Sequence, residues 1–116
     1  MTPRAFRDLA IRAIERQIAA GSRLTQGDWG QPGPGKDGCP LACGCALTLT
    51  VQDRDPAVAS EMAMIVDEPS VLAARCLGIS HSQAIKFVAG FDGASGTGPW
   101  HQAGADVAAR FAQVAS

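Results

Sequence analysis

Residues 30–37 read GQPGPGKD, which matches a phosphate-binding loop except at its last position. Such a loop needs a buried strand before it, converging backbone N–H groups, and a Ser or Thr after the Lys to bind magnesium. Pro32 and Pro34 remove two of these N–H donors, and Asp37 replaces the hydroxyl with a negative charge. The preceding residues 24–29, LTQGDW, do not read as a buried strand. We therefore expect this loop not to bind a nucleotide.

The cysteines are the second group of residues that could do chemistry: Cys39, Cys43, Cys45 and Cys76. Zinc sites commonly use two pairs of cysteines, each separated by two to four residues, and only Cys39 and Cys43 fit that spacing well. On a helix, Cys45 would point away from both of them. Buried cysteines often pack as small apolar side chains. We expect core packing without a metal or cofactor, with a zinc site or thiol chemistry as the alternative.

Other catalytic patterns are incomplete. A cysteine nucleophile needs a histidine beside it, and the candidates are His81 and His101. Both lie at expected helix starts, where the helix dipole disfavours a positive charge. Residues 93–97, GASGT, break the serine-elbow pattern at the last letter, and the twelfth position counted from Asp92 is Ala103 rather than the Glu of a calcium loop. The sequence therefore indicates a protein that is not an enzyme.

Length and charge narrow the class of protein further. The chain has 116 residues, which suits one domain, and its net charge is -1. A charge this small argues against a strong electrostatic partner such as nucleic acid. The sequence contains neither the apolar run of about 7–15 residues of a secretory signal nor the run of about 20 residues of a membrane span. We therefore expect a cytoplasmic protein that does not bind a membrane.

An amphipathic helix is predicted at the start of the chain. Thr2 can cap it, Pro3 suits its first position and Gly21 suits its end. Its apolar stripe consists of Phe6, Leu9, Ala10, Ala13, Ile14 and Ile18. A second face carries charges four residues apart: Arg4, Asp8, Arg12 and Arg16. We expect that face to be solvated, with its acidic residue pairing with the arginines on either side.

A loop rich in Gly and Pro follows, at about 21–38. Loops longer than about 12–15 residues are usually functional or disordered. Trp29 lies within it, and a large aromatic side chain in a loop usually packs against something. We predict a binding surface on this loop, formed by Thr25, Gln26, Asp28, Trp29 and Lys36. The alternative is that Trp29 only attaches the loop to the protein's own core.

The central helix is expected at about residues 40–51. Nearly every residue from Leu41 to Val51 is apolar or small, which is typical of a helix surrounded by others. Pro40 suits the first turn, and Gly44 would allow a neighbour to approach closely. The alternative is a strand, because the letters LTLTV at 47–51 alternate and are partly β-branched.

Each later helix has a start signal: Asp-Pro at 55–56, Glu-Pro at 68–69, Ser80 with Gln83 as a capping box, and Pro99. We expect these helices to end near Val66, Leu77 and Gly90, with the last one running toward the C-terminus. The expected inward residues are Val58, Met62 and Ile65; Ile85, Val88 and Ala89; and Trp100, Ala103, Val107, Phe111 and Val114. The sequence thus predicts an all-α fold, a single compact domain (1–116) of five or six helices around the central one.

Three short motifs together resemble a group of small helical proteins from phages and bacteria, of uncharacterised function. Its pattern is a first helix ending in G-x-x-x-Q-G, a helix of the C-x-G-A-L type and a late N-D-x-G turn. Gln26-Gly27 matches the first motif, residues 43–47 match the second with the Gly shifted by one place, and Asp92-Gly93 matches the third with Phe91 in place of Asn. The resemblance implies a helical fold and a mobile-element origin, and it implies no catalytic residue.

These observations favour a non-enzymatic small interaction protein that binds another protein, of a phage-type accessory or inhibitor class. The basic first helix and the acidic side chains between residues 53 and 68 offer complementary surfaces, which makes a homo-oligomer a further expectation. The acidic residues are Asp53, Asp55, Glu61, Asp67 and Glu68. The alternative function is a zinc-binding or thiol-dependent regulator that uses Cys39, Cys43, Cys45 and Cys76.

Overall fold

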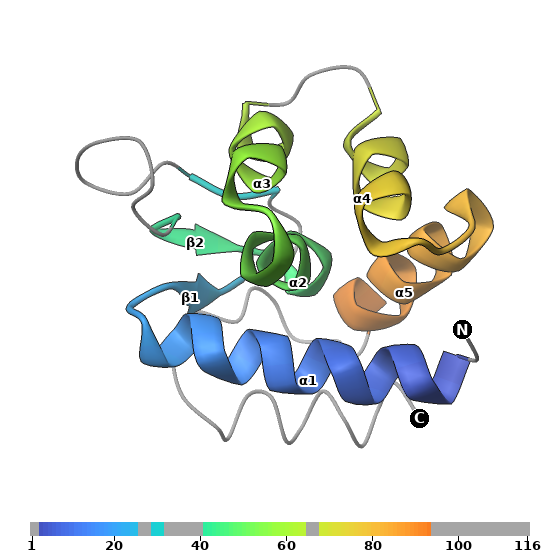
Figure 1. Ribbon diagram of the computed structural model, residues 1–116, viewed down its shortest axis with the longest axis horizontal. Coiled ribbons are helices and arrows are strands. Elements are labelled where there is room, and N and C mark those ends of the chain that lie inside the picture. The colour runs from blue at the N-terminus through green and yellow to red at the C-terminus, as the bar shows by residue number, and fades with distance from the viewer. Residues whose placement is uncertain (1–2, 26–28, 32–40, 65–67, 94–116) are drawn as a thin grey trace.

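The computed structural model of the chain describes residues 3–25, 29–31, 41–64 and 68–93. The described residues form five helices and two short strands (Figure 1). The helices are α1 (Pro3–Ala19), α2 (Ala46–Arg54), α3 (Pro56–Ala63), α4 (Pro69–Leu77) and α5 (His81–Gly93), and the strands are β1 (Arg23–Leu24) and β2 (Cys43–Gly44). The predicted all-α class is confirmed, whereas the helix predicted from Pro99 lies outside the described residues.

Helix α2 is the centre of the fold. It contacts α1, α3, α4 and α5, and Figure 1 shows it among them. All residues from Ala46 to Gln52 are buried, including two threonines. The Thr50 hydroxyl donates to the carbonyl oxygen of Ala46 at 2.7 Å, and the Thr48 hydroxyl lies 3.4 Å from the Cys45 sulfur. Because the hydroxyls find partners nearby, the polar half of the LTLTV alternation can be buried in a helix.

The predicted start of the central helix at about residue 40 is wrong. The helix begins at Ala46, after Cys45 in an extended conformation, and it continues to Arg54. Cys43 and Gly44 instead form β2, which pairs in parallel with Arg23 and Leu24 of β1. Hydrogen bonds to a segment far away in the sequence therefore hold these two residues in a strand, although local composition favours a helix.

The part of the Gly/Pro-rich loop that the structure describes is ordered by backbone pairing. The N–H of Thr25 donates to the carbonyl oxygen of Gly44 at 2.9 Å. On the other edge of β2, Gln31 forms an antiparallel bridge with Cys43, and the Gln31 N–H donates to the Cys43 carbonyl oxygen at 3.1 Å. The start of the loop and Gln31 therefore flank β2 on its two edges, and Leu24 is fully buried beside it.

The apolar stripe of α1 is confirmed, with four of its residues buried: Phe6, Ala10, Ala13 and Ile14. Phe6 makes an edge-to-face contact with Phe87 of α5, with ring centroids 4.9 Å apart. The predicted pairing of Asp8 with Arg12 is wrong, and the side chain of Arg4, its other predicted partner, lies outside the part that the structure describes. Asp8 lies 3.4 Å from the guanidinium of Arg7, and Arg16 pairs with Asp53 of α2.

The start signals of α3 and α5 act as predicted. The Asp55 carboxylate accepts hydrogen bonds from the N–H groups of Ala57 and Val58, and the Ser80 hydroxyl accepts one from the N–H of Gln83. Helix α4 ends at Gly78, which has the left-handed conformation that suits this position.

The predicted inward face of α5 is partly wrong. Ala84 is buried and Val88 packs against the core, but Ile85 is 48% exposed and Ala89 is also exposed. The helix also continues to Gly93 rather than ending near Gly90. The inward face of α5 is centred on Ala84, Phe87 and Val88. The helix is therefore rotated about its own axis by about one residue relative to the prediction.

No helix among the described residues is both long enough and apolar enough to cross a membrane.

Candidate functional site

The predicted loop surface is only partly accessible where the structure describes it. Thr25 is 3% exposed, so its side chain is not available to a partner. Trp29 is half-buried and packs against the core, which leaves part of its ring at the surface. Gln26, Asp28 and Lys36 lie outside the described residues. The core therefore holds Trp29, as the alternative prediction stated.

A polar network that the sequence analysis missed lies between α1 and α2. Gln52 is buried, and its Oε1 accepts a hydrogen bond from the N–H of Leu41 at 2.8 Å. Its Nε2 donates to Oε1 of Gln17 at 2.7 Å and to the hydroxyl of Ser22 at 3.1 Å. The Ser22 hydroxyl in turn donates to the carbonyl oxygen of Leu41 at 2.6 Å. Each of these polar groups is matched inside the fold, so the network fixes the chain rather than offering a site.

An ion pair continues this network toward the surface. The Arg16 guanidinium donates three hydrogen bonds to the Asp53 carboxylate, at 2.6, 3.0 and 3.2 Å, and Gln17 adds another at 3.1 Å. The hydrogen bonds from Arg16 lower the pKa of Asp53 despite its partial burial, which acts in the opposite direction. The charges that we expected to attract a second copy of the chain are, at this point, paired within one chain.

The described cysteines are in three different environments. Cys43 lies in β2 and Cys45 precedes α2, both buried, and Cys76 is half-buried on α4. Within the described ranges, no three side chains of His, Cys, Asp or Glu lie close enough together to hold a metal ion. Cys39 lies outside these ranges. His81 is exposed, and its Nε2 lies 2.8 Å from the Ser70 hydroxyl.

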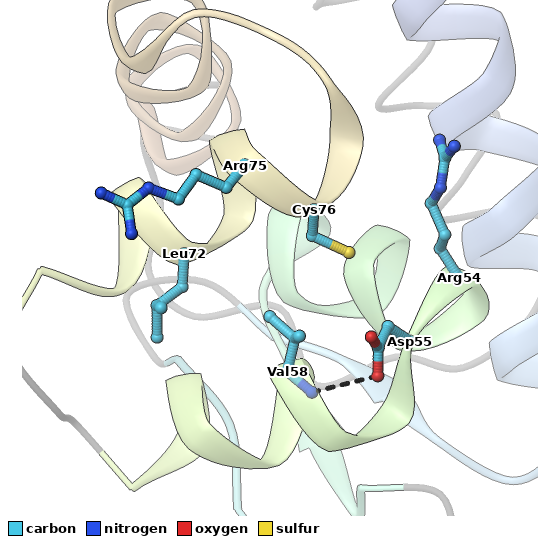
Figure 2. A pocket seen from close by; sticks show the side chains of 6 residues that line it. All are labelled: Arg54, Asp55, Val58, Leu72, Arg75 and Cys76. Atoms are coloured by element: carbon cyan, nitrogen blue, oxygen red, sulfur yellow. Dashed lines mark hydrogen bonds between the residues drawn. The ribbon is translucent and has the colours of Figure 1, made fainter.

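A pocket of about 470 Å³ lies where the turn between α2 and α3 meets α4. Its lining residues are Arg54, Asp55, Val58, Leu72, Arg75 and Cys76 (Figure 2). The α4 residues at positions 72, 75 and 76 share one helix face because three- and four-residue steps return to the same side. The other three are Arg54, the last residue of α2, Asp55 between the two helices, and Val58 in the first turn of α3. The pocket therefore depends on the angle between α3 and α4.

The pocket has an apolar centre with a guanidinium on either side. Figure 2 shows Val58 and the Cys76 thiol between Arg75 at the left and Arg54 at the right, with Leu72 below the Arg75 side chain. Val58 and Leu72 are half-buried and pack against the core, so their remaining surface faces the pocket. This arrangement resembles the apolar core and polar rim of a protein–protein contact.

The charge of the pocket is predominantly positive. Both arginines are exposed, and with the residues that the structure describes neither forms an ion pair. The Asp55 carboxylate is directed to the N–H groups at the start of α3, the nearer at 3.1 Å. Among the described residues the two guanidinium groups therefore have no carboxylate partner, whereas the Asp55 carboxylate caps α3.

Cys76 is suited to contact rather than to nucleophilic chemistry. Partial burial raises the pKa of its thiol, the charge of Asp55 raises it further, and Arg54 opposes both. The raised pKa keeps the side chain in its thiol form at neutral pH, and the thiol is the unreactive form. In this form the sulfur adds soft apolar surface to the pocket.

Comparison of the chain with family models, with curated proteins and with solved structures found no match. The candidate site therefore rests on the geometry of this chain alone, and the resemblance to small phage and bacterial proteins stays a prediction. Three of the six lining residues were named from the sequence: Cys76 as a candidate for chemistry, Val58 as an inward residue, and Asp55 as a helix start and an acidic surface residue. The two arginines could have been found by asking which basic residues end a helix beside an apolar face.

Proposed function

We propose that this protein is a non-enzymatic interaction protein that binds another protein through the pocket beside α3 and α4. The observation that carries the proposal is the apolar centre flanked by two arginines that lack an ion-pair partner among the described residues. Arginine and apolar anchors in small pockets contribute most of the binding energy in many protein interfaces. The pocket is large enough to accept one or two side chains of a partner.

The same surface gives little support to an enzymatic function. The Cys76 thiol is held in its protonated form, and the Asp55 carboxylate is occupied by backbone N–H groups. Groups in these states contact a ligand but do not readily exchange protons or bonds with it.

Other parts of the functional hypothesis stay predictions. The phage-type accessory or inhibitor class comes from the resemblance, and the cytoplasmic location and the homo-oligomer come from composition and charge. The zinc-binding or thiol-dependent regulator also stays a prediction, and elemental analysis of protein purified without added metal checks it.

Affinity capture with purified, tagged protein tests the proposed function. A partner captured from a lysate of the native host is identified and purified, and its dissociation constant is measured by titration calorimetry. We expect Arg75→Glu and Arg54→Glu each to weaken binding by about tenfold or more, because each reverses a charge beside the apolar centre. The matched control is Arg12→Glu, which reverses an exposed charge on α1.

Two outcomes would contradict this. If Arg12→Glu weakens binding as much as Arg75→Glu, the effect comes from net charge and not from the pocket. If Trp29→Ala abolishes binding while both pocket variants bind normally, the partner uses the loop surface instead. Circular dichroism of each variant confirms that the helical fold is retained.

A further inference from the structure

We infer that the partner presents an extended peptide segment in which an apolar side chain lies between two acidic residues. This inference rests on the proposed function and names the chemistry of the partner at the same pocket. Its basis is the order of the lining groups across the pocket, guanidinium, apolar centre, guanidinium (Figure 2).

The centre of the pocket selects an apolar side chain. Val58 and Leu72 each pack one side against the core, and the Cys76 side chain points toward the same pocket (Figure 2). A polar group placed over these atoms would lose its water without gaining a hydrogen bond. A leucine, isoleucine or methionine would cover them and exclude water.

The rim selects negative charge. Arg54 ends α2 and Arg75 is in the last turn of α4, and both are exposed. A guanidinium can bind a carboxylate through two parallel hydrogen bonds. A basic partner would instead place like charges beside each other, which is unfavourable. The carboxylate of Asp55 keeps its negative charge while it caps α3, but the two guanidinium groups outnumber it, so the lining remains net positive.

The positions of the two arginines indicate an extended peptide. In an extended chain, residues two positions apart point to the same side and residues one position apart point to opposite sides. With the apolar side chain in the centre, acidic residues two positions before and two positions after it would face the same way. They would then lie toward the two guanidinium groups, which are on opposite sides of the apolar residues in Figure 2.

A peptide titration tests the inference. The probe is acetyl-Gly-Glu-Ser-Leu-Ser-Glu-Gly-amide, added to the full chain labelled with ¹⁵N and followed by nuclear magnetic resonance. We expect amide shifts concentrated at Val58, Leu72, Arg75 and Cys76. We expect binding to weaken about tenfold when both Glu residues of the probe are replaced by Gln, or its Leu by Ser, because each change removes one kind of contact.

Matched variants locate the binding site. Arg54→Gln and Arg75→Gln should each weaken binding of the acidic probe about threefold, so that the two losses together match the roughly tenfold loss on replacing both Glu residues. Both variants should leave binding of the Gln probe unaffected, because that probe has no carboxylate for a guanidinium to bind. Arg12→Gln removes the same charge from the surface of α1, and this variant should bind the acidic probe like the unchanged protein.

The outcomes separate the inference from the proposed function. Equal binding of the Glu and Gln probes, or shifts located away from the pocket, would overturn the inference. If no probe binds but the captured partner still requires Arg75, the chemistry proposed for the partner is wrong and the pocket remains its site. If the partner's affinity is unchanged in both arginine variants, the proposed function itself fails.

Discussion

The side chain of Gln52 joins three segments of the chain through one buried amide. It accepts from the N–H of Leu41 and donates to Gln17 of α1 and Ser22 of the segment before β1. Leu41 begins the segment that leads to β2, so the amide links the loop ends to both α1 and α2. Buried polar groups stabilise a fold when every partner is satisfied, and they cost much when one partner is removed.

We predict that Gln52→Leu lowers the free energy of unfolding by about 2–4 kcal/mol, because it leaves the Leu41 N–H and the Gln17 amide oxygen without this partner. Urea-induced unfolding followed by circular dichroism measures the change. The control Gln31→Leu alters an exposed side chain and should change stability by less than about 0.5 kcal/mol. Equal stability of the two variants would show that the network contributes little.

The Asp53 carboxylate predicts how stability depends on pH. Its hydrogen bonds with Arg16 lower its pKa in the folded state below the unfolded value of about 3.9. The stabilisation is therefore present above the unfolded pKa and is lost as the pH falls through the folded pKa. We expect Asp53→Asn to be less stable than the unchanged protein at pH 7, and the difference to shrink below about pH 4. Urea unfolding of both proteins across this range checks it, and a constant difference would contradict it.

At the scale of elements, the start of a helix depends on residues close to it in the sequence, whereas strand pairing depends on residues far apart. Asp55 and Ser80 bind N–H groups within three residues of themselves, so short sequence patterns predict where α3 and α5 begin. Strands β1 and β2 contain two residues each and pair across the long loop. A strand of two residues is too short to show a periodic pattern. For this reason Cys43 was predicted to lie in a helix.

A substitution at Gly30 would test how tightly the loop is held against β2. Its φ of +127° is a conformation that residues with side chains rarely adopt, and an added Cβ would lie 2.8 Å from the Cys43 carbonyl oxygen. We predict that Gly30→Ala costs about 3 kcal/mol or more, from backbone strain and the clash together. Thermal and urea unfolding measure this cost.

The matched control is Gly78→Ala at the end of α4. Gly78 also has a positive φ, of +69°, but an added Cβ would meet no heavy atom within 4 Å. It should therefore cost only about 1 kcal/mol, the strain of a left-handed conformation. Equal effects of the two alanines would mean that the loop yields and that Gly30 does not determine its packing.

At the scale of the whole molecule, stability depends on α2 and the helices around it. Leu49 is fully buried, whereas Ile85 of α5 is 48% exposed. We predict that Leu49→Ala lowers the free energy of unfolding by about 2–5 kcal/mol, through lost burial and a cavity. Ile85→Ala should cost less than about 1 kcal/mol because about half of the Ile85 surface is already exposed to solvent. Denaturant unfolding compares them, and a larger loss at Ile85 would contradict the observed rotation of α5.

The sequence by itself determined the helical class, the starts of α3, α4 and α5, the apolar stripe of α1 and the burial of residues 46–51. Most of these features depend on neighbours within a few positions, such as Asp55 beside Pro56. The burial of residues 46–51 follows from a helix whose residues are apolar or small on every side. The same local information predicted that Val88 points inward. It left open whether Trp29 forms part of a binding surface or only attaches the loop to the core.

Only the tertiary structure decided the pairing of Arg16 with Asp53, the rotation of α5, the strands and the pocket. Each depends on groups far apart in the chain: Asp53 lies 37 residues from Arg16, and Arg75 reaches the pocket because α4 packs beside α3. The angle at which two helices meet follows from side chains on both of them, so no single segment encodes it. The sequence can show that Arg54 and Arg75 each lie at the end of a helix. Only the packing of α4 beside α3 places them around the same pocket.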